Sequence, residues 1–146
     1  NEFMIQGGDP LSKNAPPGTP LGSGDLGYTT TAEVDTSLIH TKGAFAAGRT
    51  NNPEKASSGC QFYIVQGKKY SDGDLNMIEM QTGIKFSPAK RNIYKTIGGT
   101  PFLDMNYTVF GEVESGLEVI DKIALAQKGM GDRPVGDVRM YIEVIK

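Results

Sequence analysis

The side chains of this chain that could do chemistry are apolar rings and amides. The first group stands in the stretch Phe3-Met4-Ile5-Gln6-Gly7-Gly8-Asp9. In an extended strand Met4 and Gln6 would point to one side and their neighbours to the other. Hydrophobic side chains beside an amide suit a surface that holds an apolar ring and hydrogen-bonds the peptide next to it. Taken alone, the stretch also fits an ordinary strand that ends in a glycine turn.

The sequence offers little for catalysis by acids, nucleophiles or metals. The only histidine, His40, has no carboxylates at a metal-ligand spacing, and we interpret it as a turn or surface residue. The only cysteine, Cys60, excludes an internal disulfide and lies in an apolar strand pattern, where a thiol is usually inert. We therefore expect no metal and no cofactor. Four aspartates fit turn and cap positions: Asp9, Asp72, Asp74 and Asp104.

One glycine-rich stretch, residues 22–27, matches the dinucleotide-binding string GxGxxG. That fingerprint needs a strand before it and a helix after it, because the helix N-terminus binds the pyrophosphate. Here a proline-rich loop precedes the string, and the β-prone Tyr28-Thr29-Thr30-Thr31 follows it. We therefore interpret the stretch as a surface loop, and an enzyme of small molecules that uses it is a minor alternative.

The composition fits one globular domain with a core of its own. The chain has 146 residues, 38% of them hydrophobic, and its 15 Lys+Arg against 17 Asp+Glu give a net charge of −2. This balance does not support nucleic-acid binding, because no basic cluster could follow phosphates. No apolar run is long enough to span a membrane. The 19 glycines and 8 prolines indicate many turns and a β-rich fold.

The elements that must position the rings and amides are short strands. Residues 40–49 read as a turn followed by a strand of small residues, and residues 59–65 as a buried strand. A third strand is expected over 107–113, and the alternation over 138–144 predicts a half-buried final strand. Ser115 is expected to cap a helix. The apolar stripe of that helix would be Leu117, Ile120, Ile123 and Ala124.

Residues 66–101 interrupt this β pattern and read as a helical insertion. Asp72-Gly73-Asp74 could open one helix. Ser87-Pro88 opens a second, with serine as N-cap and proline at the first helical position, and Gly98-Gly99 ends it. A disordered, charged loop is the alternative. The fold predicted from these elements is mainly β, an antiparallel barrel with a capping helix and an inserted helical arm.

Three motifs in this order resemble the cyclophilin family of peptidyl-prolyl isomerases. They are Phe3 to Asp9, then Gly59-Cys60-Gln61-Phe62-Tyr63-Ile64, then Leu103-Asp104 with Val109-Phe110-Gly111-Glu112-Val113. The match covers nearly the whole chain apart from the arm, and the arm and the loop 47–51 are similar to bacterial members. The resemblance implies a barrel that is eight-stranded when complete, with its first strands and helix upstream of Asn1. Residues 1–146 would then be a single, N-terminally incomplete domain with an insertion at 66–101.

The resemblance implies roles for the rings and amides. Gln6 and Phe3 match catalytic positions, and Gln6 matches the glutamine that bonds the substrate backbone near the twisting amide. Gln61 matches a neighbouring polar contact, and Tyr63 stands where an aromatic ring faces the proline. The residues that match the proline pocket are Phe3, Met4, Phe62 or Tyr63, Leu103 and Phe110.

The rim of the site is implied in the same way. The edge segment whose backbone pairs with the peptide matches Gly48, Arg49 and Thr50, and Tyr107 stands where many members have histidine. Phe102 stands where many eukaryotic members have tryptophan, so an indole N–H donor is lost. Binding of cyclosporin-type cyclic peptides is therefore expected to be weakened.

The implied activity is isomerisation of Xaa-Pro bonds, which assists protein folding. Rotation about a peptide bond faces about 18–20 kcal/mol, and a catalyst need only bind the twisted amide more tightly than the planar forms. The family's arginine at the prolyl nitrogen would fall upstream of Asn1, and Arg49 matches a rim position instead. A non-catalytic module or chaperone that binds proline-containing segments is the alternative.

The expected partners are proline-containing peptides or unfolded proteins, and we expect a monomer. The compartment stays open between the bacterial cytoplasm and the periplasm or cell envelope. The chain starts inside a strand pattern without an initiator methionine, so a leader would be out of sight.

Overall fold

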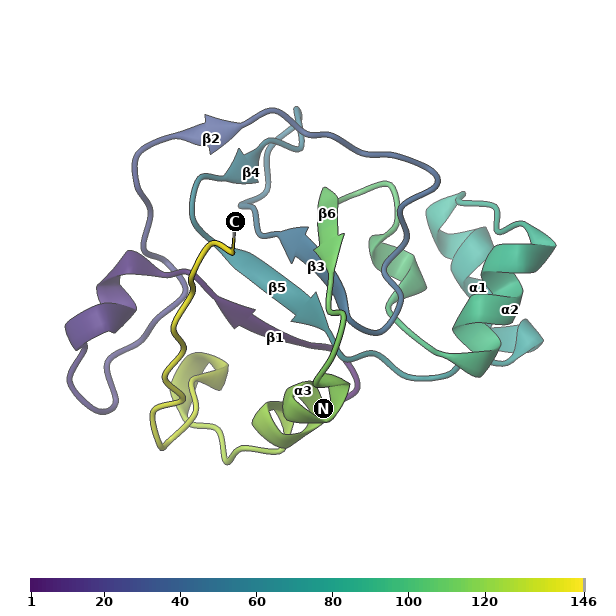
Figure 1. The fold of residues 1–146 in the computed structure, drawn as a ribbon. Coiled ribbons are helices and arrows are strands. Elements are labelled where there is room, and N and C mark those ends of the chain that lie inside the picture. Colours follow the sequence, from purple (N-terminus) through teal and green to yellow (C-terminus); the bar gives the residue numbers. More distant parts are fainter. Residues whose placement is uncertain (146) are drawn as a thin grey trace.

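A four-stranded antiparallel sheet forms the centre of the computed structural model, which describes residues 1–145 (Figure 1). Its strand order is β1-β5-β3-β6. All four strands fall inside stretches that the sequence predicts as strands. They are β1 (Met4–Gly7), β3 (Ala44–Ala47), β5 (Phe62–Val65) and β6 (Val109–Glu112).

The two faces of this sheet carry different side chains, because successive residues of a strand point to opposite sides. The register places Tyr63 opposite Gln6 on β1 and opposite Ala46 on β3. The face that carries Tyr63 is the core of the sheet. Its buried residues are Ala44, Ala46, Tyr63, Val65 and Val109, with Met4, Leu103 and Tyr107 packed against them. The opposite face presents aromatic rings, among them Phe62.

Close approaches of the backbone require glycine at several positions, and Gly8 and Gly99 are the two tightest among those with a positive φ. Gly8 has a φ of +90°, and a Cβ there would lie 2.0 Å from the carbonyl oxygen of Cys60. Gly99 has a φ of +154°, and a Cβ would lie 2.1 Å from the carbonyl oxygen of His40. The first glycine lets the chain leave β1 beside the start of β5, and the second lets the arm return against residue 40.

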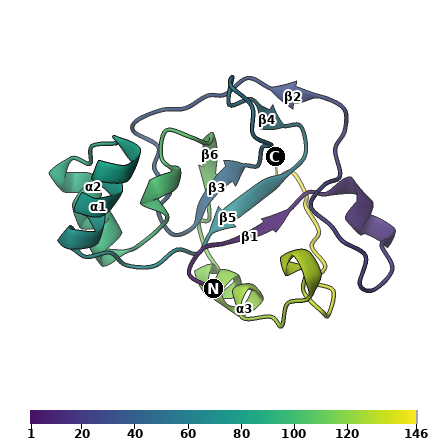
Figure 2. The same cartoon turned by 180° about the vertical axis from the view of Figure 1, so that it is seen from behind.

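Smaller elements flank the sheet (Figure 2). A two-stranded ribbon pairs β2 (Thr29–Thr30) with β4 (Ser57–Ser58), and α3 (Leu117–Ala124) packs near β1. Helix α3 buries Ile120 of the predicted stripe. Its N-cap is Gly116 in the left-handed conformation, so the prediction of Ser115 as N-cap is wrong. Three short 3-10 segments complete the elements: η1 (Pro10–Asn14), η2 (Pro101–Leu103) and η3 (Met130–Asp132).

The arm at 66–101 is a helical hairpin beside the sheet, so the alternative of a disordered loop is wrong (Figure 1). Helix α1 (Asp72–Thr82) starts with a capping box between Ser71 and Asp74. Helix α2 (Pro88–Thr96) has Ser87 as its N-cap, as predicted. The hairpin has its own buried cluster, which consists of Tyr70, Leu75, Phe86 and Tyr94. None of the helices in residues 1–145 is long and apolar enough to cross a membrane.

Within residues 1–145 the edge strands of the sheet are β1 and β6, and a closed barrel is not seen. One predicted strand is also not seen there. The segment predicted as a final strand, 138–144, is not part of either sheet and leaves the side chain of Ile142 70% exposed. An alternating pattern indicates which side chains of a strand would be buried. A strand also needs a neighbouring strand to hydrogen-bond its backbone, and the pattern gives no information about that neighbour.

Candidate active site

Apolar side chains gather over Tyr63 on the core face of the sheet. Met4, Leu103 and Tyr107 pack against the cluster that contains Tyr63. Beside them the rings of Phe3 and Phe102 stack, with centroids 5.9 Å apart and planes 20° apart. Phe3 is 42% and Phe102 37% exposed, so these two rings face solvent. We refer to five residues as the apolar platform: Phe3, Met4, Phe102, Leu103 and Tyr107.

The amide of Gln6 is held at the edge of this platform. Gln6 lies two residues beyond Met4 on β1, so the two side chains share a face. Its Nε2 donates to Oε1 of Gln61 at 2.8 Å. Nε2 of Gln61 donates in turn to the carbonyl oxygens of Gly22 at 3.0 Å and Gly24 at 2.7 Å. The Gln6 side chain is therefore oriented although it is exposed.

The glycine-rich loop is fixed by these amides and by Asp9. The buried carboxylate of Asp9 accepts hydrogen bonds from the backbone N–H groups of Leu11 at 2.8 Å, Gly22 at 2.6 Å and Gly24 at 3.1 Å. Asp9 also caps η1, as a turn and cap residue should. The strand β2, not a helix, follows the loop. The stretch 22–27 therefore supports the site from one side and lacks the helix N-terminus of a dinucleotide fingerprint.

Replacing Asp9 with asparagine should reduce the acid sensitivity of folding. Burial alone would raise the pKa of the Asp9 carboxyl, but the three backbone N–H donors outweigh burial and hold the pKa below its ordinary value. A carboxyl with a lowered pKa in the folded state stabilises the protein above its unfolded pKa of about 3.9. That stability is lost as the pH falls through the folded pKa.

We therefore expect Asp9→Asn to flatten the fall in the free energy of unfolding below about pH 4. Urea denaturation between about pH 7 and pH 3 measures this dependence. Glu54→Gln, at an exposed loop carboxyl, is the control and should keep the wild-type slope. An Asp9→Asn protein with the same acid slope as the wild type would contradict the assignment.

The predicted edge segment offers only part of its backbone to a peptide. The N–H of Gly48 donates to the carbonyl of Gln61, and the carbonyl of Gly48 accepts from the N–H of Ser58, each at 2.8 Å. The backbone N–H groups of Arg49 and Thr50 make no hydrogen bond within the described chain. The N–H groups available for pairing with a peptide are therefore those of Arg49 and Thr50 rather than that of Gly48, whereas the carbonyl of Thr50 already accepts from the side chains of Arg49 and Asn52.

The side chain of Arg49 is committed to the protein itself. Its Nε donates to the carbonyl oxygen of Asn106 at 3.0 Å, and its guanidinium carbon lies 4.7 Å from the centre of the Tyr107 ring. This cation–π contact fixes Tyr107 at the rim of the platform.

His40 is buried, so its interpretation as a turn or surface residue is wrong. The side chain is 1% exposed. Its Nδ1 lies 2.8 Å from Oδ1 of Asp104, and its Nε2 lies 2.9 Å from the hydroxyl of Tyr63. Asp104 is 4% exposed and is thus more than a turn residue. Burial is the main cause that raises the pKa of the Tyr63 hydroxyl well above its ordinary range, so this group stays protonated.

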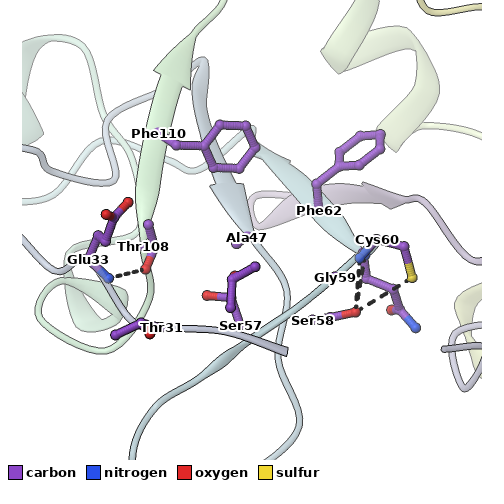
Figure 3. Close-up of a pocket in the computed structure, with 12 residues that line it drawn as sticks. Thr31, Glu33, Ala47, Ser57, Ser58, Gly59, Cys60, Phe62, Thr108 and Phe110 are labelled. Atoms are coloured by element: carbon purple, nitrogen blue, oxygen red, sulfur yellow. Dashed lines mark hydrogen bonds between the residues drawn. The ribbon is translucent and has the colours of Figure 1, made fainter. Parts of the chain in front are cut away.

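Phe62 and Phe110 do not lie with Tyr63 but on the opposite face of the sheet. There the ring of Phe45 lies 4.9 Å from Phe62 and 4.6 Å from Phe110, measured between centroids. A hollow of about 550 Å³ lies next to these rings, and Thr31, Ser57 and Thr108 belong to its wall (Figure 3). Of the alternatives Phe62 and Tyr63, only Tyr63 therefore shares a face with Met4 and Gln6.

Metal ligands do not converge in the described part of the chain. Within residues 1–145 no group of three or more His, Cys, Asp and Glu side chains is placed to hold a metal ion. The half-buried Cys60 lies with its Sγ 3.6 Å from Oγ of Ser58, close to the hollow (Figure 3). On the core face, the apolar platform and the oriented amide of Gln6 are suited to bind an apolar ring next to a peptide group.

Comparison with known proteins decides the family. The sequence model of the family described as "Cyclophilin type peptidyl-prolyl cis-trans isomerase/CLD" matches residues 1–144. The chain belongs to the cyclophilin family. The resemblance carried by the three motifs is thereby confirmed, and the mainly antiparallel β structure agrees with it.

Bacterial proteins named as peptidyl-prolyl isomerases are among the relatives. A Staphylococcus aureus (strain COL) protein named "Putative peptidyl-prolyl cis-trans isomerase" is 33% identical over 138 residues, which cover 94% of this chain and 64% of that protein. A Staphylococcus haemolyticus (strain JCSC1435) protein of the same name is 35% identical, with the same coverage. A Streptococcus pyogenes serotype M6 protein named "Putative bifunctional phosphatase/peptidyl-prolyl cis-trans isomerase" is 35% identical over 150 residues. These residues cover 99% of this chain but only 28% of the streptococcal protein. The chain thus spans less than two thirds of the length of these relatives.

Proposed function

We propose that the protein catalyses the cis–trans isomerisation of Xaa-Pro bonds in peptides and unfolded proteins. The observation that carries this proposal is the placement of Gln6, whose amide is held by Gln61 at the edge of the apolar platform. An apolar platform suits a proline ring, and a primary amide can hydrogen-bond the peptide group beside it. The membership of the chain in the cyclophilin family supports the same activity.

The proposed mechanism needs no covalent step. Isomerisation faces a barrier of about 18–20 kcal/mol, because twisting the amide removes its resonance. If the platform holds the ring while Gln6 bonds the twisted peptide, the twisted form is bound more tightly than the planar forms. Each 1.36 kcal/mol of that preference gives about a tenfold gain in rate.

The remaining site residues take supporting roles in this proposal. Tyr63 forms the floor beneath the platform, Gln61 orients Gln6, and the backbone of Arg49 and Thr50 pairs with the substrate at the rim. Phe62 and Phe110, on the opposite face, are left out of the proline pocket. We also propose that residues 1–146 act as one domain with 66–101 as an insertion, and that the protein is a monomer.

A protease-coupled assay of the full-length protein on an Xaa-Pro peptide tests the activity. The slow phase of this assay is isomerisation of the Xaa-Pro bond, which takes tens of seconds or longer without a catalyst. We expect its rate to rise in proportion to the amount of protein. Calorimetric titration of the same peptide separates the second candidate, a non-catalytic module. Binding without acceleration would favour that candidate and reject catalysis.

Cyclosporin-type cyclic peptides should bind weakly. Phe102 stands in the platform, 37% exposed and stacked on Phe3, and its ring has no N–H to donate. We expect Phe102→Trp to tighten binding of such a peptide by about two- to tenfold, since a recovered hydrogen bond contributes about 0.5–1.5 kcal/mol. Isothermal titration calorimetry measures the change. Nanomolar affinity of the unchanged protein would contradict this expectation.

A further inference from the structure

A series of buried hydrogen bonds joins the inserted arm to the ring beneath the apolar platform. The hydroxyl of Tyr94, on α2, donates to Oδ2 of Asp104 at 2.7 Å. Oδ1 of Asp104 lies 2.8 Å from Nδ1 of His40, and Nε2 of His40 lies 2.9 Å from the hydroxyl of Tyr63. We refer to these four residues as the buried polar chain. Their exposures are 0% for Tyr94, 4% for Asp104, 1% for His40 and 2% for Tyr63.

The donors and acceptors of the buried polar chain match in only one way when the histidine is neutral. A carboxylate accepts only, and Oδ1 of Asp104 also accepts the backbone N–H of His40 at 2.9 Å. Nδ1 of His40 therefore carries the proton, and Nε2 accepts the hydroxyl proton of Tyr63. Burial, above all, raises the pKa of both tyrosine hydroxyls, so each remains a donor. A fully satisfied buried network of this kind favours a single geometry.

The ring of Tyr63 is held from its sides as well as from its hydroxyl. The His40 ring stacks on it with centroids 6.0 Å apart, and the Tyr107 ring meets it edge-on at 5.7 Å. Met4 and Leu103 pack against the same cluster. A shift of the Tyr63 hydroxyl would therefore change the support of three platform residues at once.

The arm is also tied to this region through its backbone. The N–H of Thr100 donates to the carbonyl of His40 at 2.8 Å, and the N–H of Lys42 donates to the carbonyl of Gly98 at 3.1 Å. Tyr94 is enclosed by the arm's own cluster, where its ring meets Phe86 at 5.6 Å between centroids. The packed cluster of the arm therefore holds the Tyr94 ring in place, and its hydroxyl bonds Asp104 from this fixed position.

We propose that Tyr94, Asp104 and His40 are positioning residues, which hold the ring of Tyr63 under the apolar platform. The inserted arm then takes part in building the proline site, through the hydroxyl of Tyr94. The predicted effect on turnover rests on the proposed isomerase function. The predicted effect on Tyr63 itself is independent of that function. Groups held by packed side chains and further hydrogen bonds keep the geometry that catalysis requires.

The test is a double-mutant cycle on Tyr94 and Tyr63 in the full-length protein. Tyr94→Phe removes the outer hydroxyl and Tyr63→Phe the inner one, while both rings stay. We expect Tyr94→Phe to lower kcat/KM for an Xaa-Pro peptide about threefold in the wild-type background, and to have no effect on kcat/KM once Tyr63→Phe has already cut the chain. The melting temperature should fall by the same amount in both backgrounds, because the carboxylate of Asp104 loses the same donor. Equal losses of kcat/KM in both backgrounds would overturn the proposal.

A second readout does not depend on activity. The ¹³Cζ chemical shift of labelled Tyr63, measured by NMR, should change in Tyr94→Phe, because Cζ carries the hydroxyl that bonds His40 and the rest of the chain is weakened. Tyr70→Phe is the matched control, since Tyr70 belongs to the same arm cluster but not to the buried polar chain, and it should leave the shift unchanged. An unaltered Cζ shift in Tyr94→Phe would overturn the positioning role. A wild-type protein that fails to isomerise the peptide would reject the proposed function, and the Cζ shift would still decide this inference.

Discussion

Replacing Gln6 with alanine in the full-length protein is expected to lower kcat/KM for an Xaa-Pro peptide by about ten- to a hundredfold. The amide is exposed and oriented by a single bond to Gln61, so its loss removes a group aimed at the substrate. A hydrogen bond missing from the twisted state costs about 1–3 kcal/mol, which corresponds to this range of rates. The melting temperature should change little, because the bond to Gln61 lies at the surface. Protease-coupled kinetics and thermal unfolding measure the two effects.

The control for this prediction is another glutamine near the sheet. Gln66 bonds Asp121 at 3.0 Å through its Nε2 and the backbone N–H of Glu2 at 2.7 Å through its Oε1. Gln66→Ala should lower stability slightly and keep kcat/KM. A large drop in melting temperature with an unchanged rate in Gln6→Ala would show that Gln6 serves the fold and not the reaction.

The sequence predicts those elements of the fold that depend on residues close to one another in the chain. The four central strands, the helix start at Ser87 and the turn at Gly8 all follow from residue types over a few positions. The period of two in a strand also bears on the site. Because Phe62 and Tyr63 are neighbours on β5, they point to opposite faces, and only one of them can join Met4 and Gln6.

Features that depend on distant pairing could not be predicted. His40 and Asp104 meet across 64 residues of sequence, and no spacing rule connects a histidine before β3 with a carboxylate after η2. One signal was available, since a tyrosine in a buried strand needs a partner for its hydroxyl. The segment 138–144 shows the opposite failure, because the alternation is present but no strand within residues 1–145 pairs with it.

Asp104 belongs to a local turn and also makes contacts with residues that are distant in the sequence. It directly follows η2, which carries Phe102 and Leu103 of the apolar platform, and it binds His40 and Tyr94 at the same time. Its carboxylate thus links the η2 part of the platform to Tyr94 of the arm and, through His40, to Tyr63 of the sheet. We therefore expect the main effect of a substitution at Asp104 to be on the stability of the fold rather than on the catalytic step.

Replacing Asp104 with alanine is expected to lower the free energy of unfolding by about 3–5 kcal/mol, as when one partner of a buried pair is removed. The variant leaves three donors without their acceptor: the backbone N–H and Nδ1 of His40, and the hydroxyl of Tyr94. Asp104→Asn keeps one acceptor oxygen and should lose less stability, so it remains measurable if the alanine variant does not fold. Urea denaturation of both variants gives the comparison.

Asp72→Ala is the control, because Asp72 pairs with Arg91 and Lys95 at the surface, and it should leave the free energy of unfolding nearly unchanged. If Asp104→Ala were no more destabilising than Asp72→Ala, the buried polar chain would not support the fold, and the geometry of Tyr63 would have to come from packing alone.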